Sequence, residues 1–290
     1  MIQMKPFKEV LKEKKFIVTA ELFPPKGIDI TQLMNRAKFL SDYVDAFNVT
    51  DSQRAIMRLG PLAICHKLKV AGYEPIYQLT CRDRNRIALQ SDLLQASLLG
   101  IENILILSGD HPFNGDHKDA KPVYDLDPVT LLRVADSLRN GRDMNGTLLN
   151  GKPTFLLGAV VNPSVEPLDL QLIMMKKKIE SGASFFQTQI TFDINIFKNF
   201  YEKVKDYGIR VLFGVLLLKS YQMAENLNKM PGINIPQELI ERLKDTKDPI
   251  NEGITIVANL IEEIKMFADG VHIMAINAEE YIPEILKRVT

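Results

Sequence analysis

Residues 74–109 read EPIYQLTCRDRNRIALQSDLLQASLLGIENILILSG, and this stretch indicates the fold. It holds an apolar run at Glu74–Thr80, a segment of helical periodicity at Arg84–Leu99 and a second apolar run at Asn103–Gly109. Gly100 directly follows the helical segment, and glycine at that place is a common helix stop signal. The stretch is therefore predicted to form a strand, a helix and a second strand, the unit from which parallel sheets are built.

The same unit repeats along the chain. The apolar runs predicted to be strands are Phe16–Glu21, Val44–Thr50, Glu74–Thr80, Asn103–Gly109, Thr154–Asn162, Ser184–Gln189, Arg210–Leu218 and Gly270–Ile276. The amphipathic segments predicted to be helices are Asp29–Asp42, Pro61–Ala71, Arg84–Leu99, Asp127–Asn140, Pro167–Ser181, Ile194–Tyr207 and Asn251–Phe267. Lys219–Lys247 is predicted to hold two shorter helical pieces, because Pro231-Gly232 and Pro236 interrupt it.

Eight nearly all-apolar strands that alternate with helices are typical of a closed parallel barrel. We therefore predict an α/β protein, a (β/α)8 TIM barrel that forms a single domain over residues 1–290. The alternative is an open, doubly wound sheet. No GxGxxG motif follows the first strand, so the dinucleotide-binding turn of many such sheets is missing.

Composition excludes several classes of function. The 36 basic and 36 acidic residues give a formal net charge of zero, which provides no general attraction to nucleic acid or to an anionic membrane. The two cysteines, Cys65 and Cys81, form no CxxC pair, so we expect no metal or iron–sulfur site built by this chain alone. No apolar run approaches the roughly 20 residues of a membrane span, and the charged N-terminus lacks a signal peptide's apolar region. We expect a cytoplasmic protein.

Polar residues gather at the ends of six consecutive predicted strands. They are Glu21, Asn48, Thr50, Asp51, Gln78, Thr80, Ser108, Asp110, Asn162, Gln187, Thr188 and Gln189. In barrels of this type the chemistry lies at the carboxyl ends of the strands. A purely structural barrel would need no such residues there, so the pattern predicts an enzyme.

Glu21 is the first candidate for a chemical role. Its apolar neighbours would favour a protonated carboxyl group, which suits a general acid near neutral pH; the alternative is a carboxylate paired with an arginine at the barrel mouth. Asp110 follows Gly109, where backbone can approach a ligand closely, although a turn aspartate is equally compatible with the pattern. Gln78 and Gln189 are either interior amides or hydrogen-bonding partners of a flat heteroaromatic ligand.

Several short stretches together point to a family. They are Ala20-Glu21-Leu22-Phe23-Pro24-Pro25, Asn48-Val49-Thr50, Gln78-Leu79-Thr80-Cys81, Gly109-Asp110-His111-Pro112, Lys176–Ala183, and Thr188-Gln189 followed by Phe192-Asp193. They occur in order and mostly at the ends of predicted strands. On these stretches the chain resembles the flavin-dependent 5,10-methylenetetrahydrofolate reductases over nearly its whole length.

The resemblance implies a barrel with a flavin across its rim, usually FAD, with FMN not excluded. Such an enzyme reduces 5,10-methylenetetrahydrofolate to 5-methyltetrahydrofolate, with hydride delivered from N5 of the reduced flavin. Glu21 matches the general acid that protonates the N10 side of the substrate. Asp110 matches an aspartate that lies near both the flavin and the pterin. Gln189 matches an amide that hydrogen-bonds the bound folate or nicotinamide.

Other positions are implied to line the flavin. They are Thr50, Asp51, Gln53, Gln78, Ser108, Gly109, Asp110, Tyr124, Asn162 and Lys178. Lys178, with Lys176 and Lys177, would suit the diphosphate, although adjacent lysines on a helix are by default a solvated face. Tyr221 is a weaker candidate that either covers the folate or packs on the rim.

Three departures from the NADH-using bacterial enzymes affect the electron donor. Gln78 stands where a histidine is common, Ser108 replaces an arginine, and Ile276-Asn277-Ala278 lacks a further arginine. Cys81–Arg86 looks like the version found in anaerobes, including acetogens. Those enzymes often work beside a partner subunit that carries zinc or iron–sulfur centres. The donor is thus either NAD(P)H or such a redox subunit, and we also expect the chain to form an oligomer.

Three other readings remain open on the sequence. The chain could be a non-catalytic folate-binding barrel subunit serving a methyltransferase, a pterin-binding methyltransferase domain, or a flavin-free reductase. A carrier needs no acid aimed at N10, so Glu21 argues against the first. Bound flavin in the purified protein would separate the favoured hypothesis from the folate-binding subunit.

Overall fold

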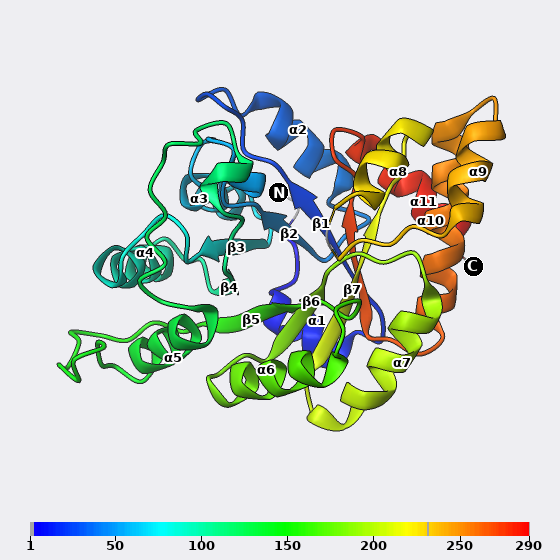
Figure 1. Cartoon of the computed structure of the whole chain (residues 1–290). Helices are drawn as coiled ribbons and strands as arrows, with labels where there is room; N and C mark the ends of the chain where they lie inside the picture. The colour runs from blue at the N-terminus through cyan, green and yellow to red at the C-terminus, as the bar shows by residue number, and fades with distance from the viewer. Residues whose placement is uncertain (1–2, 231, 290) are drawn as a thin grey trace.

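The eight predicted strands form a closed parallel barrel. The computed structural model describes residues 3–230 and 232–289. Its strands, in barrel order, are β1 (Ile17–Leu22), β2 (Ala46–Val49), β3 (Pro75–Thr80), β4 (Asn103–Leu107), β5 (Leu156–Val161), β6 (Phe185–Thr188), β7 (Arg210–Leu216) and β8 (Gly270–Met274). β8 pairs with β1 in parallel and closes the barrel, so the TIM-barrel prediction is confirmed and the open sheet is excluded (Figure 1).

Helices surround the barrel. They are α1 (Phe7–Glu13), α2 (Thr31–Leu40), α3 (Pro61–Val70), α4 (Arg86–Leu98), α5 (Pro128–Arg139), α6 (Leu168–Glu180), α7 (Ile194–Val204), α8 (Tyr221–Asn228), α9 (Gln237–Asp245), α10 (Pro249–Lys265) and α11 (Ile282–Arg288). Short 3-10 helices are η1 (Gln53–Ala55), η2 (Pro112–Asn114), η3 (Lys205–Tyr207) and η4 (Glu279–Tyr281). The predicted helical segments are confirmed, including the two short pieces, α8 and α9, between β7 and α10.

Local sequence explains where several helices begin. The Asn85 side chain accepts hydrogen bonds from the backbone N–H groups of Ile87 and Ala88 at the start of α4. Asp127 caps α5 in the same manner, with proline at its first position. Both are preferred residue types at helix starts, since they satisfy backbone donors that the helix leaves free.

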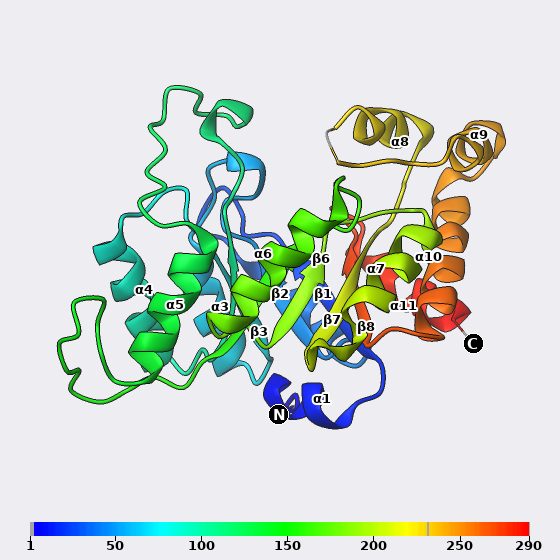
Figure 2. The same cartoon turned by 60° about the horizontal axis from the view of Figure 1, so that its bottom comes forward.

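The amino-terminal end of the barrel is closed by α1, which the sequence did not predict. Phe7, Val10 and Leu11 are buried and pack under the strands, and the Phe7 ring meets the Phe185 ring edge-on at 5.5 Å between centroids. Figure 2 shows α1 beneath the barrel, with α8 at the opposite end. This apolar closure leaves the carboxyl ends of the strands as the open end.

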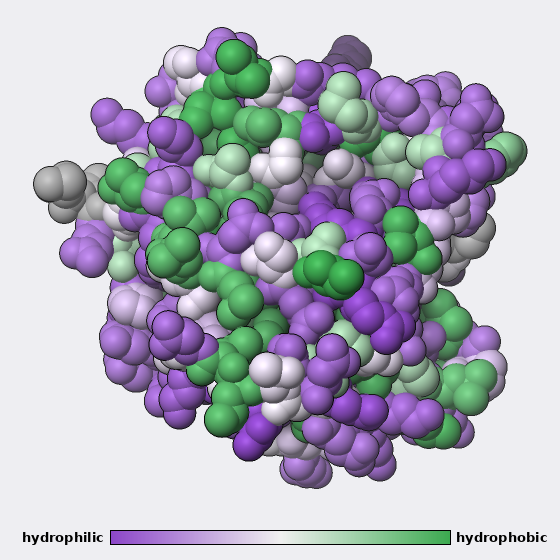
Figure 3. Space-filling model, turned by 90° about the vertical axis from the view of Figure 1, so that its left-hand side faces the viewer, coloured by the Kyte–Doolittle hydropathy of each residue, from purple (hydrophilic) through white to green (hydrophobic). Residues whose placement is uncertain are grey.

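The side of the barrel that carries α4 exposes several large apolar residues. On α4 itself, Ile87, Leu94 and Leu98 are exposed. Figure 3 shows apolar side chains gathered among polar ones on this face. No helix in the described ranges is long and apolar enough to cross a membrane.

Candidate active site

A cavity of about 430 Å³ lies at the carboxyl end of the barrel and collects most of the predicted site residues. The predicted residues that line it are Glu21, Gln53, Gln78, Ser108, Gly109, Asp110, Asn162, Lys178 and Gln189. A second cavity of about 750 Å³ lies beside α1 at the opposite end and contains none of these residues. Because barrel enzymes use the carboxyl ends of their strands, the first cavity is the candidate active site.

Glu21 lies at the floor of this cavity, near the end of β1. Its side chain is buried, and its Oε1 accepts a long hydrogen bond of 3.4 Å from Gln78 Nε2. The ionisable group beside it is His272, whose Nε2 lies 3.5 Å from Oε1. The partner of Glu21 is thus a histidine and not the arginine that the alternative expected. Glu21 Oε2 is buried without a hydrogen-bond partner among the described residues. One carboxyl oxygen of this buried side chain therefore has no partner among the described residues.

A buried polar network lies beneath Glu21 inside the barrel. His272 Nδ1 is 3.0 Å from Thr19 Oγ1, and Gln187 Nε2 donates to the same oxygen at 3.3 Å. Gln187 and Asn48 exchange two hydrogen bonds, of 2.7 and 3.0 Å. Thr19 Oγ1 accepts from Gln187 and can donate its own hydrogen to His272 Nδ1; in that arrangement the ring proton lies on Nε2 and faces Glu21.

Sequence reasoning did not assign a role to this network. The sequence pattern places Asn48 and Gln187 at the rim and indicates no role for His272 or Thr19. A signal in the sequence could have identified Thr19. It is two residues from Glu21 in the same strand, so the two side chains lie on the same face of the sheet. A histidine within the apolar run Gly270–Met274 is a second such signal.

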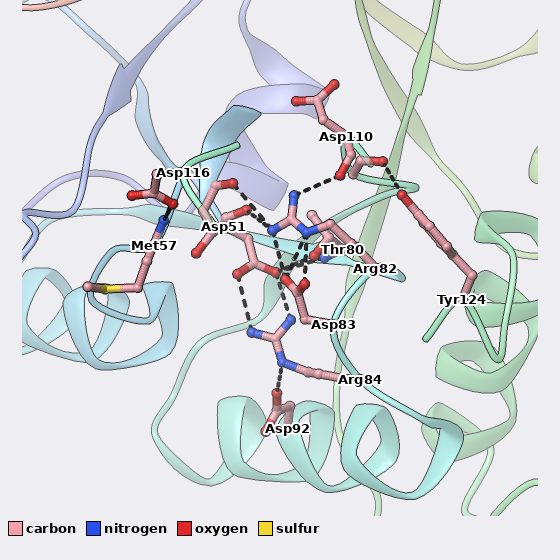
Figure 4. Close-up of polar contacts among 12 residues, drawn as sticks. Asp51, Met57, Thr80, Arg82, Asp83, Arg84, Asp92, Asp110, Asp116 and Tyr124 are labelled. Atoms are coloured by element: carbon pink, nitrogen blue, oxygen red, sulfur yellow. Dashed lines mark hydrogen bonds and ion pairs between the residues drawn. The ribbon is translucent and has the colours of Figure 1, made fainter. Parts of the chain in front are cut away.

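Asp51 lies behind the cavity wall, with both carboxylate oxygens already bonded. Oδ2 accepts from the Thr80 backbone N–H at 3.0 Å and from the Thr80 hydroxyl at 2.8 Å. Arg84 donates to Oδ2 at 2.8 Å and to Oδ1 at 3.2 Å, as Figure 4 shows. Asp51 therefore links the end of β2 to the end of β3 through Thr80. It is not among the residues that line the cavity.

Arg82 joins three strand ends beside this pair. Its guanidinium is almost fully buried, donates to the backbone oxygens of Ser52 and Asp110 at 3.3 Å each, and forms an ion pair with Asp83. Sequence reasoning gave Arg82 no individual role. It fixes the backbone on either side of the cavity entrance, so that Asp110 is held by its carbonyl while its side chain remains exposed (Figure 4).

Gly109 and Tyr124 shape the loop above β4. Gly109 has φ +82, and a Cβ there would lie 3.0 Å from Thr80 Cβ, so only glycine suits this turn. The Tyr124 hydroxyl donates to the Gly109 carbonyl at 3.0 Å. Burial raises the pKa of the Tyr124 phenol, which keeps it a donor. Tyr124 thus supports the cavity wall from outside the lining.

Lys178 is the lysine of its cluster that reaches the cavity. Its Nζ donates to the Val160 carbonyl at 2.6 Å, and burial lowers its pKa. Lys176 and Lys177 are exposed, and Lys176 Nζ lies 5.3 Å from the centre of the Tyr207 ring. The solvated-face alternative therefore describes Lys176 and Lys177, whereas Lys178 is a partly buried cation at the site.

Thr50 and Tyr221 lie outside the cavity lining. Thr50 is fully buried, and its hydroxyl has no hydrogen-bond partner among the described residues. Tyr221 begins α8 and packs against the apolar cluster beneath α8 and α9, with Lys244 Nζ 5.9 Å from its ring centre. Tyr221 thus packs at the rim, and its contact with folate stays a prediction.

Comparison with known proteins identifies the family. The family model for methylenetetrahydrofolate reductase matches residues 6–290. The chain belongs to the methylenetetrahydrofolate reductase family. The resemblance inferred from the short motifs is thereby confirmed.

Relatives of this reductase family include bacterial and eukaryotic members. The chain is 25% identical over 278 residues to the 5,10-methylenetetrahydrofolate reductase of Escherichia coli, which covers 91% of this chain and 87% of that protein. It is 25% identical over 298 residues to a probable methylenetetrahydrofolate reductase (NADPH) of Caenorhabditis elegans, covering 96% of this chain. The chain spans only 43% of the length of the Caenorhabditis elegans protein.

A solved structure with the same fold is a protein from Clostridium thermocellum that binds two copies of 5-methyl-5,6,7,8-tetrahydrofolic acid. The two chains superpose with a TM-score of 0.70 over 98% of each, at 15% sequence identity. At that identity the likeness shows the barrel fold alone.

The lining suits a flavin, the cofactor of this reductase family. Gln78, Asn162 and Gln189 offer both donors and acceptors, which match the edge of a planar heteroaromatic ring. Lys178 supplies a partly buried cation of the kind that binds phosphate. Within residues 3–230 and 232–289, no group of three or more His, Cys, Asp or Glu side chains could hold a metal ion.

Proposed function

We propose that the chain reduces 5,10-methylenetetrahydrofolate to 5-methyltetrahydrofolate, with Glu21 as the general acid. The observation that carries this proposal is the position of Glu21, a buried carboxyl group with one unbonded oxygen at the floor of the cavity. When bound, a reduced flavin would supply the hydride. We propose FAD as this flavin, with FMN as the alternative that the lining residues also suit.

Glu21 would act on the substrate's five-membered ring. The methylene carbon is bonded to both N5 and N10 and is a poor hydride acceptor while the ring is closed. A proton delivered to N10 breaks the bond between N10 and this carbon and leaves an iminium with N5. Hydride added to that carbon then gives the methyl group, so the substrate gains one proton and one hydride.

The other lining residues would bind and orient the two ring systems. Gln189 and Asp110 lie across the same cavity as Glu21, and we assign them to the pterin. Gln78 donates to Glu21 Oε1 and would hold the carboxyl group in its orientation. Gln53, Ser108, Gly109 and Asn162 are assigned to the flavin ring, and Lys178 to its phosphate.

The source of the electrons is a separate question. We propose either NAD(P)H or a partner redox subunit with zinc or iron–sulfur centres. The exposed apolar residues on α4 support an association with further protein, including self-association into an oligomer (Figure 3). Sedimentation of the purified chain tests the oligomer directly.

An absorbance experiment tests the proposal. The purified chain, reconstituted with FAD, is reduced anaerobically with NADH and then mixed with methylenetetrahydrofolate. Bleaching by NADH and recovery with folate are expected of a self-sufficient reductase. Flavin that NADH leaves oxidised but methyltetrahydrofolate reduces would place the folate half-reaction here and the donor in a partner. Failure to bind any flavin, even after reconstitution, would overturn the proposal and favour the non-catalytic folate-binding subunit.

A further inference from the structure

The cavity at the amino-terminal end of the barrel is strongly basic. It has a volume of about 750 Å³ and lies between α1 and the loops that precede β5, β6, β7 and β8. Six basic side chains line it: Lys8, Lys12, Arg139, Lys152, Lys205 and Arg210. Asp269 is the one acidic residue of this lining among the described residues. The chain as a whole has a formal net charge of zero, so the excess of positive charge is local to this cavity and attracts anions to it.

Three of these cations have no acidic partner. Lys8, Lys12 and Lys152 are exposed, and none of the ion pairs among the described residues includes them. The other three each have an acidic partner. Lys8 and Lys12 lie four residues apart on α1 and therefore share one face of the helix, where like charges repel each other. An anion in the cavity would relieve this repulsion.

Two arginines are held in place at the cavity by backbone carbonyl groups. Arg139 donates to the Phe155 carbonyl at 3.1 Å, and Arg210 donates to the Leu11 carbonyl at 3.0 Å. Arg210 also pairs with Asp269 at 2.6 Å. A guanidinium has five N–H donors, so each arginine keeps donors for a further acceptor. Because the two groups are already oriented, a ligand that binds them has less side-chain freedom to remove.

The rest of the lining is partly apolar. Leu11, Pro153, Phe155 and Ile209 contribute to it, between the basic side chains. The volume falls within the range of roughly 300–1,000 Å³ that small-molecule sites have. Arginine and lysine are the side chains that bind phosphate groups, and apolar surface beside them accommodates an organic part.

We propose that this cavity binds a small anion that carries two or more phosphate groups. Lys8, Lys12 and Lys152 would pair with the phosphates, and the two arginines would add hydrogen bonds. The cavity shares no lining residue with the candidate active site, which lies at the carboxyl end of the barrel. The inference therefore goes beyond the proposed function and does not depend on it.

Calorimetry with ATP as the probe tests the site. The protein is loaded with FAD, separated from excess flavin and titrated without magnesium. We expect ATP to bind with a Kd below about 1 mM, and Lys12→Gln and Lys152→Gln each to raise this Kd about five-fold, as expected for one lost ion pair that faces solvent. AMP, which has a single phosphate, should bind at least about ten-fold more weakly than ATP, and high salt should weaken both.

Two variants serve as controls. Lys229→Gln removes an exposed cation just beyond α8, at the opposite end of the barrel, and should leave the Kd of ATP unchanged. Lys178→Gln removes the cation that lines the candidate active site, and ATP bound in the basic cavity should not respond to it. Inorganic tripolyphosphate is titrated in parallel. Both results with it uphold the site: weaker binding than ATP would identify a nucleotide as the ligand, and equal binding an inorganic polyphosphate.

Two results would overturn the site. One is the absence of binding heat up to about 1 mM ATP, or a Kd that is the same in the parent, Lys12→Gln and Lys152→Gln. The other is ATP binding that Lys178→Gln abolishes, because the ligand would then lie in the candidate active site. Folate reduction is measured in none of these titrations, so failure of the proposed function would be a separate result.

Discussion

His272 Nε2 lies 3.5 Å from Glu21 Oε1, and this contact links the proposed acid to a buried polar network inside the barrel. The network continues through Thr19, Gln187 and Asn48, all of which are buried. The opposite carboxyl oxygen has no partner among the described residues. Glu21 is thus held at one oxygen by Gln78 and His272, while its other oxygen makes no hydrogen bond with a described residue.

Replacing Glu21 by glutamine should abolish folate reduction and leave flavin binding intact. The amide keeps the shape of the side chain but has no proton to give to N10. We expect the folate half-reaction, followed by stopped-flow absorbance, to slow by about 10²–10⁴-fold. Glu280→Gln, at an exposed glutamate, is the matched control and should react normally. Turnover of Glu21→Gln within a few-fold of the parent would show that another group supplies the proton.

His272 is predicted to position Glu21 without contacting the substrate's reacting atoms. His272→Gln should slow the folate half-reaction by about ten-fold, which corresponds to about 1.4 kcal/mol, and should change its pH profile. Thr19→Ser, which keeps the hydroxyl, is the control and should retain the parental profile. A pH profile that is unchanged in His272→Gln, together with a lower thermal midpoint, would assign the histidine to packing.

The sequence was sufficient for the barrel because its signals are local. Each strand is an apolar run, each helix has its own period, and glycine or proline marks many of the boundaries. Helix α1 was missed because it has only seven residues and three apolar positions. Those positions are buried only against the barrel floor, which is formed by strands from the whole chain.

The site was predictable in part because some of its signals are also local in the sequence. Polar residues at the strand ends stand out, and most of them line the cavity. Neither Asp51 nor His272 could be placed by that pattern, since their surroundings depend on distant residues. Asp51 turns toward Arg84, 33 positions along the chain, and His272 meets Thr19 across the closure between β8 and β1.

The ion pair between Asp51 and Arg84 is predicted to stabilise the fold. Asp51 is buried, so removing its charge leaves the Arg84 guanidinium with Asp92 as its remaining ion-pair partner among the described residues. We expect Asp51→Asn to lower the free energy of unfolding by about 3 kcal/mol, measured by urea denaturation. Glu13→Gln removes an exposed partner of Lys5 and should leave the urea midpoint unchanged. Equal midpoints for both variants would contradict a structural role for Asp51.

The last prediction concerns stability at alkaline pH. Burial raises the pKa of the Cys81 thiol to about 12, from an ordinary value of 9.0. Between these two values the unfolded chain loses a thiol proton that the folded chain keeps, so ionisation favours unfolding. The stabilising effect is therefore complete below about pH 9 and is lost as the pH rises toward 12, by up to about 1.4 kcal/mol per pH unit.

Cys81→Ala isolates this effect, because Cys65 and the other titrating groups are common to both proteins. Urea denaturation at pH 8, 9 and 10 should show the parent losing stability relative to Cys81→Ala above pH 9, and a constant difference between the two below it. The same burial should protect the folded thiol from iodoacetamide at pH 8, whereas the unfolded chain reacts. Curves that stay parallel up to pH 10 would mean that the Cys81 thiol ionises as readily in the folded protein as in the unfolded chain.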